Sequence, residues 1–165
     1  MKKLLIILIL LPLAVQSQDK GYAFLQPSFF IKRNYTNQFN LNGGVGFRLG
    51  DYIGLGISLD AYVFKKAADP FIIPKADFRG FLFPKDKNVL PFLAFQPGYV
   101  VYKQTVQRVT TKGAAAFDAL IGVLAKPPKG GIGFTMSMGY SSFGFSAPGV
   151  SIRYNGFKVQ AGVAF

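Results

Sequence analysis

The sequence predicts an all-β fold, an eight-stranded antiparallel up-and-down transmembrane β-barrel, and three observations lead to it. Apolar and polar residues alternate along most of the chain, as in strands with one apolar face. Phe, Tyr and Gly are abundant, with 18, 8 and 19 copies in 165 residues, whereas Glu is absent, so strands and tight turns are favoured over surface helices. The mean hydropathy of +0.30 is high for a soluble domain with a polar surface.

Residues 1–17 are expected to be a cleaved signal peptide, and residues 18–165 a single barrel domain. Lys2 and Lys3 precede a twelve-residue apolar run that ends at Val15. That run is too short for a membrane-spanning helix, which needs about twenty residues. An uncleaved anchor is the alternative. Cleavage would remove two lysines and lower the net charge from +12 to +10. The mature protein is therefore expected to be basic and to lie outside the cytoplasm.

Eight alternating segments are expected to form the strands, and their lengths suit tilted crossing of a bilayer. The clearest alternation runs from Tyr52 to Val63, and a tight turn at Gly50-Asp51 is expected to precede it. The first segment is ambiguous, because Leu25 and Phe29 compete with Phe24 and Phe30 for the apolar face. The candidate strands are 21–33, 38–49, 52–64, 71–83, 90–103, 113–125, 132–142 and 150–165.

The connections between these segments differ on the two sides of the predicted barrel. The turn-forming residues of 50–51, 84–88 and 126–131 give three connections on the periplasmic side, where both termini are also expected. The four connections on the outward side are mostly longer, around 34–37, 65–70, 104–112 and 143–149. Pro27 and Pro97 lie inside candidate strands, and bulges or strand breaks are expected there because proline cannot donate to a ladder.

A network of charged side chains is expected to fill the lumen. Lys or Arg on the lipid face at mid-bilayer costs about 2–4 kcal/mol, so mid-strand charges should point inward. All of them lie on the face opposite the apolar set: Arg48, Asp60, Lys75, Asp77, Arg79, Asp118 and Lys158. Eight strands enclose a lumen just wide enough for side chains, so a filled barrel is favoured over a pore. The same lumen is expected to hold Asn40, Asn42, Gln96, Tyr52 and Tyr62.

Two other classes of function stay open at this point. A narrow channel for small solutes would use the same transmembrane barrel. A soluble periplasmic ligand-binding barrel would place the apolar faces inside and the charges outside. Its exterior would then be the face rich in glycine, with only one or two charges per strand, which is sparse for a surface in water.

The last nine residues alternate between apolar and other residues and end on an aromatic: Phe157, Val159, Ala161, Val163 and Phe165 share one face. This pattern resembles the C-terminal signal read by the outer-membrane assembly machinery. With the signal peptide and the eight alternating segments, the whole mature chain resembles the small outer-membrane β-barrel proteins of the OmpA-like or porin families. The resemblance implies the outer membrane of a Gram-negative bacterium and contact with that machinery. Val163 stands where many family members carry an aromatic.

Catalytic, metal and cofactor sites are not expected. The chain has neither His nor Cys, which removes the commonest general base and the thiolate nucleophile. Asp60 and Asp77 could form a catalytic carboxylate pair, and with Asp118 they could hold a metal, but ion pairs with the basic residues of the same face are favoured. The glycine runs at 43–46, 54–56 and 130–133 do not match a phosphate-binding loop and are interpreted as small inward residues that make room for aromatic rings, or as kinks in the barrel strands.

The outward connections carry basic residues that suggest an anionic partner. Lys65, Lys66, Arg108 and Lys112 lie there, and lipopolysaccharide would be the nearest anion. The alternative is ordinary solvated charge, since exposed charges carry little specific energy. Nucleic acid is not expected, because the signal peptide takes the protein out of the cytoplasm. The sequence therefore favours a monomeric barrel with a structural or surface-interaction role.

Overall fold

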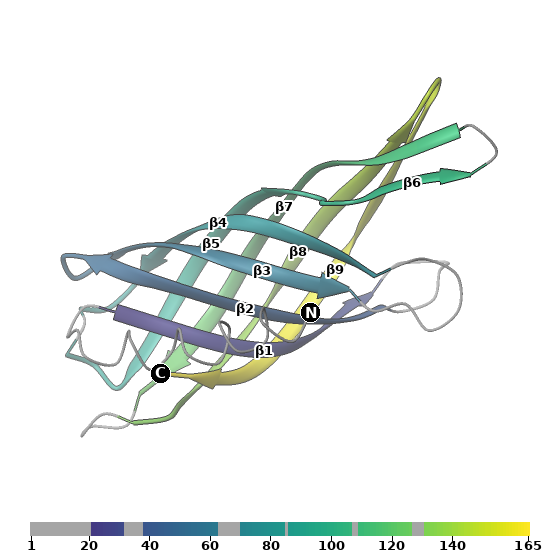
Figure 1. The fold of residues 1–165 in the computed structure, drawn as a ribbon. Helices are drawn as coiled ribbons and strands as arrows, with labels where there is room; N and C mark the ends of the chain where they lie inside the picture. Colours follow the sequence, from purple (N-terminus) through teal and green to yellow (C-terminus); the bar gives the residue numbers. More distant parts are fainter. Residues whose placement is uncertain (1–20, 32–37, 63–69, 85, 107–108, 127–130) are drawn as a thin grey trace.

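The computed structural model describes residues 21–31, 38–62, 70–84, 86–106, 109–126 and 131–165. Within these ranges the chain forms nine strands and no helix (Figure 1). The strands are β1 (Gly21–Ile31), β2 (Gln38–Leu49), β3 (Ile53–Tyr62), β4 (Phe71–Phe81), β5 (Val89–Tyr99), β6 (Lys103–Val106), β7 (Val109–Ala125), β8 (Gly133–Ala147) and β9 (Val150–Ala164).

Eight of the strands close into an antiparallel up-and-down barrel, which confirms the predicted fold class. Each strand pairs with its neighbour in the chain from β1 to β5 and from β7 to β9. The β1–β9 and β5–β7 pairings complete the wall. The remaining strand, β6, pairs only with β7 and lies beyond the barrel. In Figure 1 the β6–β7 and β8–β9 hairpins project beyond the ends of β3 and β4.

Two of the expected outward loops are strands in the structure. Residues 104–112 were expected to be a connection, but β6 pairs there with the first part of β7, in a register that places Lys103 opposite Lys112. Residues 143–149 were expected to be another, but β8 and β9 continue to Ala147 and Val150, and a tight turn joins them. Gly149 occupies that turn with a φ of 74°, which residues with side chains rarely adopt. Both hairpins continue the barrel ladder, so cross-strand pairing overrides the polar composition of 104–112 and the turn-forming composition of 143–149.

The exterior and the interior of the barrel differ in the way that is typical of a transmembrane barrel. Every barrel strand carries large apolar residues on its outward face; examples are Phe29, Phe39, Ile57, Phe78, Leu93, Ile121, Phe134 and Phe157, which are 46–64% exposed. The seven charges of the predicted lumen network are at most 4% exposed. This arrangement is the inverse of a soluble ligand-binding barrel, whose polar residues face outward.

The ambiguous first strand follows the same rule. Tyr22, Phe24 and Phe30 point into the barrel and are at most 4% exposed. Phe29 and Ile31, at 53% and 44%, face outward. The inward aromatic residues lie near the two ends of β1, and the buried polar residues between them continue the same face. Alternation alone could not decide the parity, because both faces of this segment carry large apolar residues.

Inward glycines leave the space that these aromatic rings occupy, as the sequence predicts. A Cβ atom placed on Gly44 would lie 2.5 Å from the ring of Phe24, and one on Gly46 would lie 2.4 Å from the ring of Tyr22. Both glycines lie in β2, and both aromatic residues lie in the neighbouring strand β1. Because a Cβ would also approach the carbonyl oxygen of the next strand at 2.7–2.8 Å, the backbone leaves no room for a side chain.

The prolines do not break the strands, which corrects the prediction for Pro27 and Pro97. Pro27 keeps its pairing with Leu41, and Pro97 keeps its pairing with Phe117. The missing N–H groups instead leave gaps on the opposite side of each strand, in the β1–β9 and β4–β5 ladders, with the same register before and after. A register shift occurs instead in β7, between Gly113 and Ala116.

Candidate functional site

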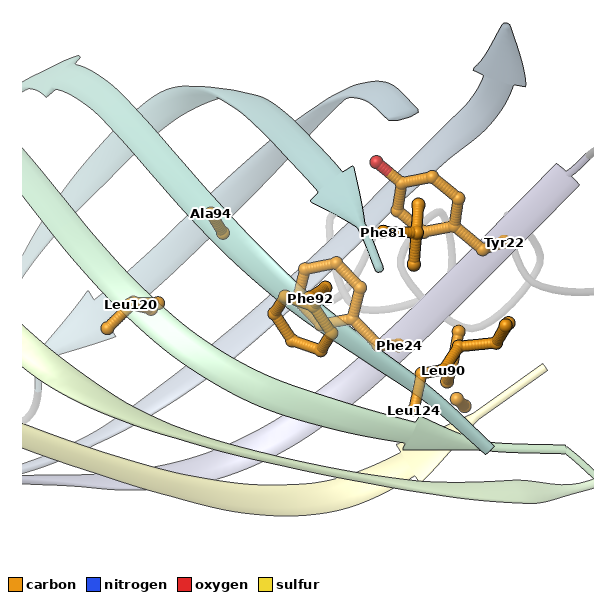
Figure 2. Packing of buried hydrophobic residues seen from close by; sticks show 9 residues of the cluster. Tyr22, Phe24, Phe81, Leu90, Phe92, Ala94, Leu120 and Leu124 are labelled. Atoms are coloured by element: carbon orange, nitrogen blue, oxygen red, sulfur yellow. The ribbon is translucent and has the colours of Figure 1, made fainter. Parts of the chain in front are cut away.

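The barrel interior consists of three layers along its length, and the first is an apolar layer at the end of the barrel where β1 begins and β9 ends. Figure 2 shows this layer, in which aromatic and aliphatic side chains from five strands meet. Its larger members are Tyr22, Phe24, Phe81, Leu90, Phe92, Leu120 and Leu124, each at most 4% exposed. Phe81 packs edge-on against both Tyr22 and Phe92, at ring-centroid distances of 6.3 and 6.1 Å. This layer closes the lumen at the end where β1 begins and β9 ends.

A second aromatic layer closes the opposite end of the lumen. Phe30, Tyr62, Phe71, Ile73, Val100, Ala116 and Phe143 are all at most 5% exposed. Tyr62 stacks on Phe71 with centroids 4.8 Å apart, and Phe143 stacks on Tyr154 at 5.3 Å. Tyr102, Phe145 and Tyr154 pack on this layer from the projecting hairpins and are partly buried. The hairpins therefore extend the core beyond the barrel wall.

Between the two apolar layers lies a charged layer, whose centre we call the central charge cluster: Asp60, Lys75, Asp118 and Lys158. Lys158 Nζ lies 2.7 Å from Asp60 Oδ2 and 2.8 Å from Asp118 Oδ2. Lys75 Nζ binds the same two carboxylates, at 2.5 Å from Asp118. The four residues come from β3, β4, β7 and β9, so the cluster joins opposite parts of the wall.

The carboxylates of the central charge cluster also accept hydrogen bonds from neutral neighbours. Asn42 Nδ2 donates to Asp60 Oδ1 at 2.6 Å, and Ser141 Oγ donates to Asp118 Oδ1 at 2.6 Å. The cluster therefore has no net charge and satisfies both carboxylates from several sides. Buried charges are tolerated when they are paired and hydrogen-bonded in this way, and removal of one partner is costly.

A second ion pair lies next to the first apolar layer, the one that contains Phe24 and Phe92. Arg79 Nε donates to Asp77 Oδ2 at 2.8 Å, and Gln96 Nε2 donates to Asp77 Oδ1 at 2.9 Å. The guanidinium carbon of Arg79 lies 4.3 Å from the ring centroid of Phe24 and 4.7 Å from that of Phe92. Arg79 thus connects the charged layer with the aromatic layer through cation–π contacts.

Arg48 has a different environment from the other six charges. Its guanidinium donates to the backbone carbonyl of Asp51 and, at 3.4 Å, to that of Phe83, and its carbon lies 4.1 Å from the ring centroid of Phe81. No described carboxylate lies within ion-pair distance of it. Arg48 therefore binds the turns at the rim of the barrel that follow β2 and β4. Lys126 directly follows the end of β7. Its burial lowers its pKa, and the positive charge of Arg48 lowers this pKa further.

Apart from Arg48, the charged groups of the interior are engaged with one another. Both aspartates of the central charge cluster are held by two lysines, so neither is placed as a free general base. Within the described ranges no group of three or more acidic residues is placed to hold a metal ion. A groove of about 360 Å³ lies on the outer surface over Gly80, between Ile53 and Leu93, and not in the lumen.

The remaining predicted site residues have these places in the structure. Phe157, Val159, Ala161 and Val163 of the proposed assembly signal lie along the outward face of β9, and Phe165 follows its end. Lys112 is exposed, but it lies in β7 and not in a loop. Lys65, Lys66 and Arg108 lie outside the described residues, as does the segment 1–17. Tyr52 was expected in the lumen but is 54% exposed, because it belongs to the turn before β3.

The sequence interpretation missed two features of the site. It treated the lumen charges as one network, whereas the structure separates the central charge cluster, the Asp77–Arg79 pair and Arg48. It also missed the exposed basic residues Lys103 and Arg153, which lie on the projecting hairpins. Continued alternation through 143–155 is the signal that would have found the second of these hairpins.

Comparisons with known proteins identify the fold through structure alone. A scan against protein-family models found no match, and a search of curated protein sequences found none either. Neisserial surface protein A (NspA) matches with a TM-score of 0.62 and 15% identity over 87% of this chain and 94% of that chain. The fold is that of the small outer-membrane β-barrels. The N-terminal β-barrel domain of Pseudomonas aeruginosa OprF also matches, with a TM-score of 0.53 and 12% identity over 90% and 98% of the two chains.

Proposed function

We propose that the protein is an integral barrel of the outer membrane with a structural or surface-interaction role, and that it does not form a pore. The observation that carries this proposal is the combination of an apolar exterior with a lumen filled by side chains. Asp60, Gln96 and Lys158 in the charged layer are 0% exposed, so surrounding side chains cover them completely. An open pathway for solutes requires wetted lumen walls.

The other candidate functions have less support. A narrow channel would need both apolar layers to open and the central charge cluster to separate. A soluble barrel would expose the apolar exterior to water, and large exposed apolar surfaces normally mark contact with a membrane or a partner. An enzyme would need a free acid, base or nucleophile, and the ion pairs occupy the buried aspartates.

The same proposal covers export, insertion and partners. Residues 1–17 direct secretion and are removed, and the outward face of β9 with Phe165 is read by the assembly machinery. The barrel then works as a monomer in the outer membrane. Lipopolysaccharide is the proposed partner of the basic residues on the outward side, which include Lys65, Lys66, Arg108 and Lys112.

The decisive experiment combines fractionation with gel mobility and conductance. The protein should resist extraction by sarkosyl and should migrate differently on a gel before and after heating, as folded outer-membrane barrels do. In planar bilayers the folded protein should give no discrete conductance. Recovery in the soluble periplasmic fraction would overturn the membrane proposal, and steady single-channel currents would revive the channel.

A further inference from the structure

The two projecting hairpins form a short sheet whose outer face carries three exposed cations, which we call the outer basic patch: Lys103, Lys112 and Arg153. Lys103 pairs with Lys112, and Lys112 pairs with Ser146, which in turn pairs with Ser151. Ser146 has the same parity in β8 as Met138 and Tyr140 of the lipid-facing belt. The outer basic patch is therefore the continuation of the apolar exterior, on the part of the sheet that lies beyond the barrel wall.

The side chain of Arg153 lies across this sheet and towards the lysines. Its Nε atom is 3.9 Å from the position that a Cβ on Gly144 would take, and the methyl group of Ala114 is 3.6 Å from the same position. Gly144 pairs with Arg153 and has no side chain to hold the guanidinium away from the sheet. The small residues Gly144, Ala114, Ser146 and Ser151 thus leave a shallow surface among the three cations.

The charge of the outer basic patch is not balanced by the described part of the protein. Like charges directly opposite each other in a sheet are destabilising, and Lys103 and Lys112 occupy such a pair. None of the three cations takes part in an ion pair with a described residue. The described acids lie elsewhere: Asp60, Asp77 and Asp118 are buried in the lumen, and Asp51 and Asp86 are in connections at the opposite end. An external anion would remove this repulsion.

The height of the patch relative to the apolar belt indicates which anion it can meet. Tyr140 pairs with Phe157 in the last large aromatic tier of β8 and β9, and such tiers mark the membrane interface. Nearby, the Tyr99 hydroxyl donates to the carbonyl of Gly113 at 2.6 Å and so points away from the belt. Arg153 lies four residues beyond Phe157, or about 13 Å along the strand. This is the level of lipid headgroups, above the acyl chains.

We propose that the outer basic patch binds the phosphate groups of a phosphorylated glycolipid headgroup in the outer leaflet. Arg153 would bind one phosphate through two parallel hydrogen bonds, which suits a guanidinium, and Lys103 and Lys112 would supply point charges to the same or a neighbouring phosphate. Ser146 and Ser151 can donate hydroxyl hydrogen bonds to phosphate or sugar oxygens. The inference rests on the proposed function, because it needs the projecting hairpins to emerge from the outer leaflet.

The test uses the full mature chain, folded in phosphatidylcholine vesicles and titrated with purified lipopolysaccharide. The variant K103Q/K112Q/R153Q should bind at least about tenfold more weakly than the parent, because each cation near an anionic surface contributes to binding. The charge-conserving variant K103R/K112R/R153K should retain most of the binding. Dephosphorylated lipopolysaccharide should bind the parent as weakly as intact lipopolysaccharide binds the glutamine variant.

Several outcomes would overturn the inference. Equal binding by the parent and the glutamine variant would remove the patch from the site. Competition by inorganic phosphate at matched phosphate concentration would indicate a site for the free ion, and equal binding to phosphatidylglycerol vesicles would indicate a preference for any anionic surface. A loss in K87Q, at the opposite end of the barrel, equal to the loss in the single variant K112Q would assign the effect to net charge.

Heat-dependent gel mobility distinguishes failure of the outer basic patch to bind lipopolysaccharide from failure of the proposed function. Folded barrels that do not bind lipopolysaccharide would contradict the patch alone, whereas a parent chain that does not insert into vesicles would contradict the membrane barrel. If the glutamine variant fails to fold, the single variant K112Q, which changes one exposed side chain, is titrated in its place.

Discussion

Ala23 and Phe165 exchange both of their backbone hydrogen bonds and thereby close the barrel. The N–H of Phe165 donates to the carbonyl of Ala23 at 2.8 Å, and the N–H of Ala23 donates to the carbonyl of Phe165 at 3.1 Å. This pair lies at the seam between β1 and β9, one residue beyond the pairing of Phe24 with Ala164. Phe165 therefore belongs to the ladder as well as to the proposed assembly signal.

Deletion of Phe165 is expected to leave secretion intact and to reduce the amount of folded protein in the outer membrane. The change removes the terminal aromatic and two seam hydrogen bonds together. Phe165→Ala keeps both backbone bonds and removes the ring alone, so comparison of the two variants separates recognition from closure. The measurement is the fraction of heat-modifiable protein in the membrane. Wild-type levels for Phe165→Ala would show that the ring is not part of a signal.

Replacement of Arg79 by Leu is expected to destabilise the barrel by about 3–5 kcal/mol, because Asp77 would remain buried without its cation. The urea midpoint of unfolding in detergent or vesicles measures this loss. Lys87→Leu, in an exposed connection, is the control and should have little effect. An unchanged midpoint for Arg79→Leu would mean that water reaches Asp77, and would favour the channel.

Lys158 is expected to show strong coupling with Asp118, since they share an ion pair at 2.8 Å within the central charge cluster. Lys158→Met leaves two carboxylates with one lysine and should cost about 3–5 kcal/mol. The double variant Lys158→Met/Asp118→Asn restores neutrality, so its cost should be clearly smaller than the sum of the single variants. Additive costs from the same unfolding measurements would contradict a closed charge cluster.

Gly44→Val is expected to be strongly destabilising, because even its Cβ would lie 2.5 Å from the ring of Phe24 and 2.8 Å from the carbonyl oxygen of Ile57. Overpacking of this kind costs about 1–3 kcal/mol, or more where the backbone must move. Gly80→Ala is the control, since a Cβ on Gly80 has nothing within 4 Å. Its effect should stay within about 0.5 kcal/mol. Equal urea midpoints for the two variants would contradict the described packing of β1 against β2.

The sequence by itself determined the fold class, because alternation has the period of a strand and a one-residue slip would move charges such as Asp60 to the lipid face. The same cost argument placed all seven mid-strand charges inside. It also gave the turn at Gly50-Asp51 and the role of the inward glycines, since local residue types specify both features.

Only the tertiary structure decided which charges meet. Lys158 and Asp60 are 98 residues apart in the chain, and their contact depends on barrel closure and strand tilt, which bring β9 and β3 together across the lumen. Closure also decided the parity of β1, where both faces carry large apolar residues and the strand takes its orientation from β2 and β9. The projecting hairpins depend in the same way on continued pairing with their neighbours. Lys103 and Lys112 become adjacent through that pairing, although each alone is an ordinary polar residue in a loop-like segment.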